Sequence, residues 1–410
     1  MSEIVTEKNL KNLFGNDAYS EAPLSKSGAG IKFYGIDLCN KLGANKVEFL
    51  LNALSRYRII CIANQNLDKF SLNHLETFAN YWGAPVPHPS NFKRGGKSAQ
   101  SDGETSGIIE WTPIEQRQSS LINKVFPDQL ECLPHKSPAV LVVSNFQDSV
   151  SGSGIASNDD NKKITVGNWH TDIEYEPVPI YVSMFLAHHL PTNRSQNTGN
   201  WITPPVIKGF NETPYFPGSD PDLLRLRLDL PLNGETAFAD TVAAFASLPE
   251  KQRNELANIK VLRKLNENDT GWFAPLVRTN PLSGLKSLHS PIWASRPGER
   301  PPITVENMTE QESRTLLDEL ELHVLQPQFR YHHPHVPGDV TVWDNYMTIH
   351  NNPFIKTNIN NLGDARLLYR ISCKGSPSLN LPRKDPEEWL KKNITASYRT
   401  PLELLQLANH

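Results

Sequence analysis

The order in which helix-like and strand-like patterns follow one another limits the fold of this chain more than any other sequence feature. Apolar residues recur at helical spacing in residues 45–57 and again from the N-cap residue Ser71 to near Gly83. From residue 139 onward the apolar segments are mostly short and strand-like. Because few of them alternate with helices in βαβ order, the pattern favours an α+β fold with an antiparallel core over a doubly wound parallel sheet.

Several individual elements follow from these patterns. The predicted strands are residues 58–63, 139–143, 180–190, 340–343 and 366–372. A further helix is predicted at residues 308–325, where Thr309 and Glu312 have capping-box spacing, and another at 386–408.

The chain shows no linker that would divide it into domains. The Gly/Ser-rich segments 93–108 and 147–163 are short for linkers between domains. They lie between strand-like runs, so we expect them to be surface loops that are long for a compact domain. A single domain over residues 1–410 is therefore predicted.

Composition excludes several classes of protein. Lysine plus arginine is 41 and aspartate plus glutamate is 44, so the net charge is −3, without the basic excess of a nucleic-acid-binding protein. No apolar run approaches the ~18 residues that a membrane helix needs, and the charged N-terminus lacks the apolar core of a signal peptide. The four cysteines are far apart, which argues against a disulfide framework or a structural zinc cluster. We expect a cytoplasmic protein with neither a nucleic-acid nor a membrane partner.

The first residues that could carry chemistry are His170 and Asp172, in the segment Trp-His-Thr-Asp. On an extended chain, side chains two residues apart point the same way, about 6–7 Å from each other. An imidazole and a carboxylate in this arrangement could bind one metal ion. Alone, the pair could equally be polar residues at the end of a strand.

A second candidate is His350, which follows a predicted strand and the segment Trp-Asp-Asn. Alone, it could be a core or surface histidine. If it folds back onto His170 and Asp172, the three form a facial triad of two histidines and one carboxylate. Such a triad leaves three positions open on iron(II) and suits oxygen chemistry.

The third candidate is a pair of arginines, Arg366 and Arg370, which share one face of the predicted strand 366–372. Either both guanidinium groups reach water at the edge of a barrel, or they bind carboxylate or sulfonate groups, whose geometry they match. Four residues at ~3.3 Å place them about 13 Å apart, too far for one carboxylate. Arg370 should then bind a second anion or pair with an internal acidic side chain.

Taken together, His170-x-Asp172, a distant His350 after Trp-Asp-Asn, and Arg366 sixteen residues later resemble the TauD/TfdA family of Fe(II)/2-oxoglutarate dioxygenases. Further segments resemble the family's motifs, namely residues 83–89, 232–238, 277–284 and 337–339. The resemblance implies a distorted double-stranded β-helix, a relative of the jelly roll, with flanking helices.

The resemblance also implies roles for individual residues. His170, Asp172 and His350 would bind Fe(II), and Arg366, helped by the hydroxyl of Thr236, would hold the distal carboxylate of 2-oxoglutarate. O2 would take the remaining open position, and the products would include succinate and CO2. Halogenating relatives have a small residue in place of the carboxylate, so Asp172 favours hydroxylation or another oxidative step.

For the substrate, the taurine branch of the family is the archetype. His88 and Arg370 correspond to residues that hold the sulfonate there, and Tyr175 stands where that branch has a pocket aromatic. His289 replaces an apolar pocket residue, so it is either another polar contact to the substrate or a solvent-facing strand residue. A small anionic substrate is expected. The alternatives are an amino-acid-modifying oxygenase with Arg370 on the α-carboxylate, or a non-catalytic metal-binding sensor.

Compared with compact relatives, two regions are additional. An insertion at about 191–232 could reshape the entrance or contribute to a homo-oligomer contact, and a helical extension is expected at about 380–410. The histidines at 332, 333 and 335 resemble a second metal site, but no carboxylate or cysteine accompanies them. We expect them to be a solvated strand end.

Overall fold

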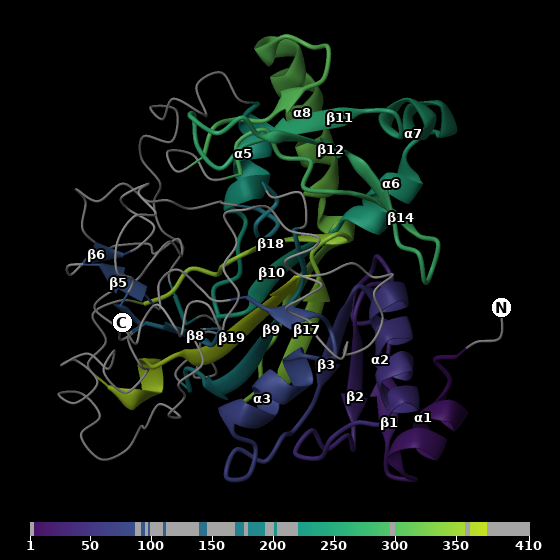
Figure 1. Ribbon diagram of the computed structural model, residues 1–410, viewed down its shortest axis with the longest axis vertical. Helices are drawn as coiled ribbons and strands as arrows, with labels where there is room; N and C mark the ends of the chain where they lie inside the picture. The colour runs from purple at the N-terminus through teal and green to yellow at the C-terminus, as the bar shows by residue number, and fades with distance from the viewer. Residues whose placement is uncertain are drawn as a thin grey trace.

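The computed structural model describes residues 4–86, 92–94, 97–98, 110–111, 139–145, 169–175, 179–192, 201–202, 220–295, 300–356 and 361–374. The helices are α1 (Glu7–Phe14), α2 (Ala44–Tyr57), α3 (Leu72–Ala79), α5 (Pro221–Leu228), α6 (Thr241–Ser247), α7 (Glu250–Leu256) and α8 (Glu310–Val324). Figure 1 shows α1, α2 and α3 beside the large sheet, whereas α5 to α8 gather at the opposite end of the molecule.

The strands form a large sheet, a small sheet and separate hairpins. The large sheet contains β1 (Tyr19–Glu21), β2 (Ile31–Tyr34), β3 (Ile59–Ile62), β17 (Val340–Asp344), β9 (Ile180–His189), β19 (Leu367–Lys374) and β4 (Ala84–Pro85), in that order, and β8 (Leu141–Ser144) pairs with β19. Only β2 and β3 run parallel among these pairs. The mixed α+β fold and the antiparallel core are therefore confirmed.

A small sheet has the order β16 (Arg330–His333), β10 (Thr236–Asp240) and β18 (Thr348–Asn351). The remaining strands are β5 (Phe92–Arg94), β6 (Lys97–Ser98), β7 (Glu110–Trp111), β11 (Lys260–Arg263), β12 (Trp272–Pro275), β13 (Val277–Thr279), β14 (Lys286–Leu288) and β15 (Thr304–Val305). They form two three-stranded sheets and the hairpin of β13 and β14.

The two main sheets face each other across an apolar layer. Phe238 from the small sheet packs with Phe185, Trp343 and Leu368 from the large sheet. Side chains alternate between the two faces of a strand, so Trp343 of β17 points into this layer. Its neighbour Val342 points to the other face of the large sheet, where it joins the core beneath the helices. Residues on the inner faces of β9, β10, β17, β18 and β19 are therefore brought into one enclosed region.

Two further cores support this arrangement. Leu50 and Leu54 of α2, one helical turn apart, pack with α1, α3 and the outer face of the large sheet. At the other end, α8 begins with the predicted Thr309–Glu312 capping box. Its buried residues Leu317 and Leu320 pack with Leu223 of α5, so part of the predicted insertion belongs to the core.

Most predicted elements are confirmed, with shifted ends. The helix that begins after Ser71 ends at Ala79, earlier than predicted. The predicted strand 139–143 starts two residues later, at Leu141. The helix predicted at 386–408 and the extension at 380–410 lie outside the described residues. Sequence patterns did not indicate the short helices α1, α5, α6 and α7.

The prediction for the histidine cluster is wrong. His333 and His335 are buried because the large sheet faces them: His333 bonds Thr341 of β17, and His335 packs against Phe185 of β9. Among the described residues, no helix combines the length and apolar character that crossing a bilayer requires.

Candidate active site

The chain brings His170 and His350 together through the backbone. The two residues form an antiparallel bridge, with His170 N donating to His350 O at 3.1 Å and His350 N donating to His170 O at 2.9 Å. His350 lies on β18, which pairs with β10 through Phe238. A residue 180 positions away in the chain is thus fixed beside His170.

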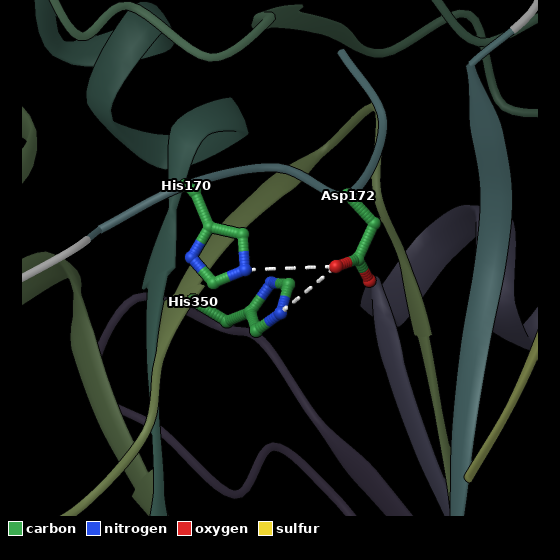
Figure 2. Close-up of side chains that lie close together, drawn as sticks. All are labelled: His170, Asp172 and His350. Carbon is green, nitrogen blue, oxygen red and sulfur yellow. Dashed lines mark ion pairs between the residues drawn. The ribbon is translucent and has the colours of Figure 1, made fainter. Parts of the chain in front are cut away.

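The side chains of His170, Asp172 and His350 converge, as Figure 2 shows. Nε2 of His170 lies 3.5 Å from Oδ1 of Asp172, and Nε2 of His350 lies 3.7 Å from the same oxygen. One nitrogen or oxygen atom from each residue lies within 4.8 Å of the others, and all three residues are buried. This is the convergence that the sequence predicted.

The second carboxylate oxygen of Asp172 has its own partners. Oδ2 accepts a hydrogen bond of 2.6 Å from Ser183 Oγ and contacts Nη2 of Arg370. Asn345 Nδ2 donates to the same serine hydroxyl at 3.1 Å. Burial alone would raise the pKa of Asp172, but Arg370, His350 and His170 outweigh it and hold that pKa well below its usual range. Asp172 is therefore ionised with Oδ1 directed at the histidines.

This donor set fits iron(II). Two imidazole nitrogens and one carboxylate oxygen on one side of a site are the ligands of non-haem iron oxygenases. The partners of Asp172 Oδ2 fix the orientation of the carboxylate, as residues behind metal ligands commonly do. The ring of Trp343, 5.2 Å from that of His350, adds an apolar wall.

The residues predicted to bind 2-oxoglutarate lie around one turn. Arg366 is buried, and its Nε donates to Gly234 O at 3.3 Å. Gly234 has φ +81°, and a Cβ there would approach Arg366 Nε to 3.5 Å. Thr236, two residues later, begins β10 and is also buried. The side chain of Trp201, from the predicted insertion, lies on the same turn.

The predicted substrate residues have different surroundings. Arg370 pairs with Asp172, which is the internal acidic partner considered as the alternative. Tyr175 packs under the guanidinium of Arg300, with 3.9 Å between Cζ and the ring centre. His88 lies outside the described residues.

His289 is fully buried, so it is not a solvent-facing strand residue. Its ring lies 5.5 Å from that of Tyr346, and Arg263 donates to the backbone oxygen of His289 at 2.6 Å. Burial, together with Arg278 and Arg263, holds the pKa of His289 well below its ordinary value, so the imidazole is neutral. The sequence analysis predicted neither the buried surroundings of His289 nor the hydrogen bond from Ser183 to Asp172, because no recognisable residue spacing indicates either of them.

Comparison with known proteins identifies the family. The family model described as "Taurine catabolism dioxygenase TauD, TfdA family" matches residues 21–358. This chain belongs to the TauD/TfdA family. The match includes His170, Asp172 and His350 and ends before Arg366 and Arg370.

Curated relatives in this family are moderately similar. Pentalenolactone F synthase of Streptomyces arenae is 26% identical over 243 residues, which cover 52% of this chain and 62% of that protein. Alpha-ketoglutarate-dependent 2,4-dichlorophenoxyacetate dioxygenase of Burkholderia sp. (strain RASC) is 32% identical over 138 residues, 29% of this chain and 43% of that protein. The (S)-phenoxypropionate/alpha-ketoglutarate-dioxygenase of Sphingobium herbicidovorans is 25% identical over 233 residues, 51% of this chain and 64% of that protein. The chain thus spans less than two thirds of the length of each of these relatives.

Solved structures share the TauD/TfdA fold. A taurine dioxygenase from Burkholderia xenovorans has a TM-score of 0.51 and 19% identity, covering 88% of this chain and 92% of that one. AAD-2 in complex with Mn(II) and N-oxalylglycine also has a TM-score of 0.51, with 18% identity over 87% of this chain and 98% of that chain.

Proposed function

We propose that this protein is an Fe(II)- and 2-oxoglutarate-dependent dioxygenase that oxidises a C–H bond of a small anionic substrate. The observation that carries the proposal is the convergence of His170, Asp172 and His350 in a chain of the TauD/TfdA family. We further propose that the two facing sheets are the family's distorted double-stranded β-helix, within a single domain.

In this proposal, Nε2 of each histidine and Oδ1 of Asp172 hold the iron. Ser183 and Arg370 keep the carboxylate in place through Oδ2. The bound iron, with 2-oxoglutarate and O2, supplies oxidative decarboxylation to succinate and CO2 coupled to oxidation of the substrate. The apolar rings of Trp343 and Phe238 beside His350 limit the access of water.

Arg366 and Thr236 would bind the distal carboxylate of 2-oxoglutarate. A buried guanidinium is stable when it faces an anion, and the fork of Arg366 matches a carboxylate. The nearby glycine turn and Trp201 restrict the space around the arginine side chain.

Unpartnered donors support an anionic substrate. In the described part of the chain, Nε of Arg370, Nε and Nη2 of Arg278, and both ring nitrogens of His289 are buried without hydrogen-bond partners. Nε and Nη2 form the edge of a guanidinium that donates two parallel hydrogen bonds to a carboxylate. Two relatives are named for a phenoxyacetate and a phenoxypropionate, which are carboxylates. A carboxylate substrate is therefore supported as well as a sulfonate substrate.

The test is a screen for substrate-stimulated succinate formation with Fe(II), 2-oxoglutarate and O2. The panel contains alkylsulfonates, aryloxyalkanoates and amino acids. Sulfite release would identify the sulfonate class, whereas succinate coupled to an amino acid without sulfite would favour the amino-acid-modifying oxygenase. Loss of stimulation when the acid is replaced by its neutral amide would confirm recognition of the anion. The cytoplasmic location and the homo-oligomer remain predictions.

A further inference from the structure

A buried hydrogen bond connects Thr236 to a histidine that has no role in the proposed function. Thr236 Oγ1 and His335 Nε2 lie 2.8 Å apart. The exposed fraction is 1% for Thr236 and 0% for His335, so bulk water does not compete for this bond. The contact arises because β10 pairs with β16, two residues before His335.

The direction of this bond depends on the tautomer of His335. A neutral imidazole donates from one ring nitrogen and accepts at the other, whereas a hydroxyl has one proton and can also accept. The carboxylate of 2-oxoglutarate only accepts. If Thr236 donates its proton to that carboxylate, it has none left for His335, and His335 must be the donor.

We propose that His335 is a positioning residue whose Nε2–H donates to Thr236 Oγ1 and directs the threonine proton to the distal carboxylate of 2-oxoglutarate. This inference rests on the proposed binding of 2-oxoglutarate by Thr236. It adds a residue that does not itself touch the cosubstrate.

Packing fixes the ring that would donate. The rings of Phe185 and His335 are nearly perpendicular, with 5.7 Å between their centres, and the rings of His333 and His335 are also nearly perpendicular, with 4.9 Å between their centres. His333 is itself anchored, because its Nε2 bonds Thr341 Oγ1 at 2.8 Å and its Nδ1 bonds Tyr331 OH at 3.1 Å. Reorientation of His335 would therefore require the surrounding side chains to move.

Binding of 2-oxoglutarate to Mn(II)-loaded protein without O2, measured by calorimetry, tests the role without turnover. His335→Leu should weaken binding about three- to tenfold, the usual effect of losing one hydrogen bond. His335→Gln keeps an N–H donor near the position of Nε2 and should restore most of the affinity. The matched control is His332→Leu, which alters a histidine of the same cluster on the opposite face of β16, without a bond to Thr236, and should leave the affinity unchanged.

The background variant Thr236→Val separates this inference from the proposed function. In that background, His335→Leu should have no additional effect, because the histidine acts only through the hydroxyl. An unchanged affinity in Thr236→Val alone would overturn the cosubstrate role of Thr236, and the role of His335 with it. If Thr236→Val weakens binding but His335→Leu does not, only the inference about His335 is wrong.

A direct observation of the tautomer decides the question even if His335→Leu does not fold. Nitrogen NMR of ¹⁵N-histidine-labelled, Zn(II)-loaded protein with 2-oxoglutarate distinguishes the two tautomers, and His335→Gln assigns the signal. The proposal predicts a protonated Nε2 and an unprotonated Nδ1. A proton on Nδ1 alone would mean that Thr236 donates to His335, and would overturn the proposal.

Discussion

Ser183 donates a hydrogen bond of 2.6 Å to Oδ2 of Asp172, while Oδ1 of the same carboxylate faces the two histidines. The serine lies on β9, at the centre of the large sheet, so its position is set by strands on both sides. One carboxylate oxygen is thus held by the protein and the other is directed at the candidate metal site.

Ser183→Ala should lower the affinity for Fe(II) about tenfold, since losing a partner of a metal ligand typically costs 10–100-fold. Competition with a colorimetric chelator under anaerobic conditions measures this affinity. Ser372→Ala is the control, because Ser372 Oγ lies 2.9 Å from Ser183 Oγ and makes no hydrogen bond to Asp172. Equal affinities in wild type and Ser183→Ala would show that the serine does not support the metal ligand.

Arg366→Ala should weaken 2-oxoglutarate binding by about 2–5 kcal/mol, because it removes one partner of a desolvated charge pair. Arg366→Lys keeps the charge but not the fork and should give an intermediate loss. Calorimetric titration with 2-oxoglutarate measures both variants. If Arg366→Ala binds the cosubstrate normally, another cation holds its carboxylate.

Arg370→Gln should affect two properties, because the arginine contacts Asp172 and has an unpartnered Nε. We expect a strong rise in the KM for the substrate and a smaller loss of Fe(II) affinity. The affinity for 2-oxoglutarate, measured at saturating metal, should change little. A variant that loses 2-oxoglutarate but binds substrate normally would reverse the roles of Arg366 and Arg370.

His333 should make the protein sensitive to acid. Burial, helped by Lys32, lowers the pKa of His333 from 6.5 to about 3. In the unfolded chain the histidine takes up a proton as the pH falls below about 6.5, whereas in the folded protein it does not, so stability falls with decreasing pH. The slope from this residue is about 1.4 kcal/mol per pH unit between roughly pH 6 and pH 4. Urea unfolding of wild type and His333→Gln across this range measures the difference; parallel pH profiles would contradict the prediction.

Sequence reasoning located the site but not its surroundings. The spacing of His170 and Asp172 indicated that these two side chains point the same way, because local extended geometry determines this. His350 was added to them by the resemblance of the ordered motifs to the TauD/TfdA family. Ser183 and His335 were not predicted, because their roles depend on contacts with residues that are 11 and 99 positions away.

The errors have similar causes. His333 and His335 looked like a solvated strand end because nothing near them in sequence shows that β9 and β17 of the large sheet face them. Helices α1, α5, α6 and α7 have only 7 or 8 residues and were not predicted. The equally short α3 was predicted because its apolar spacing follows the N-cap residue Ser71. The alternation of β19 was predicted correctly: Leu368 joins the layer between the sheets, and Leu367 and Tyr369 join the core beneath the helices.

Oxygen-dependent conversion of 2-oxoglutarate to succinate tests the central claim most directly. Wild-type protein reconstituted with Fe(II) should form succinate, at a rate that increases with a matching small anionic substrate. His170→Ala, Asp172→Ala and His350→Ala should each lose most of this activity together with Fe(II) binding, because each removes one of three protein ligands. Wild-type turnover in any of these variants with iron bound normally, or no succinate from iron-loaded wild type with the whole panel, would contradict the account.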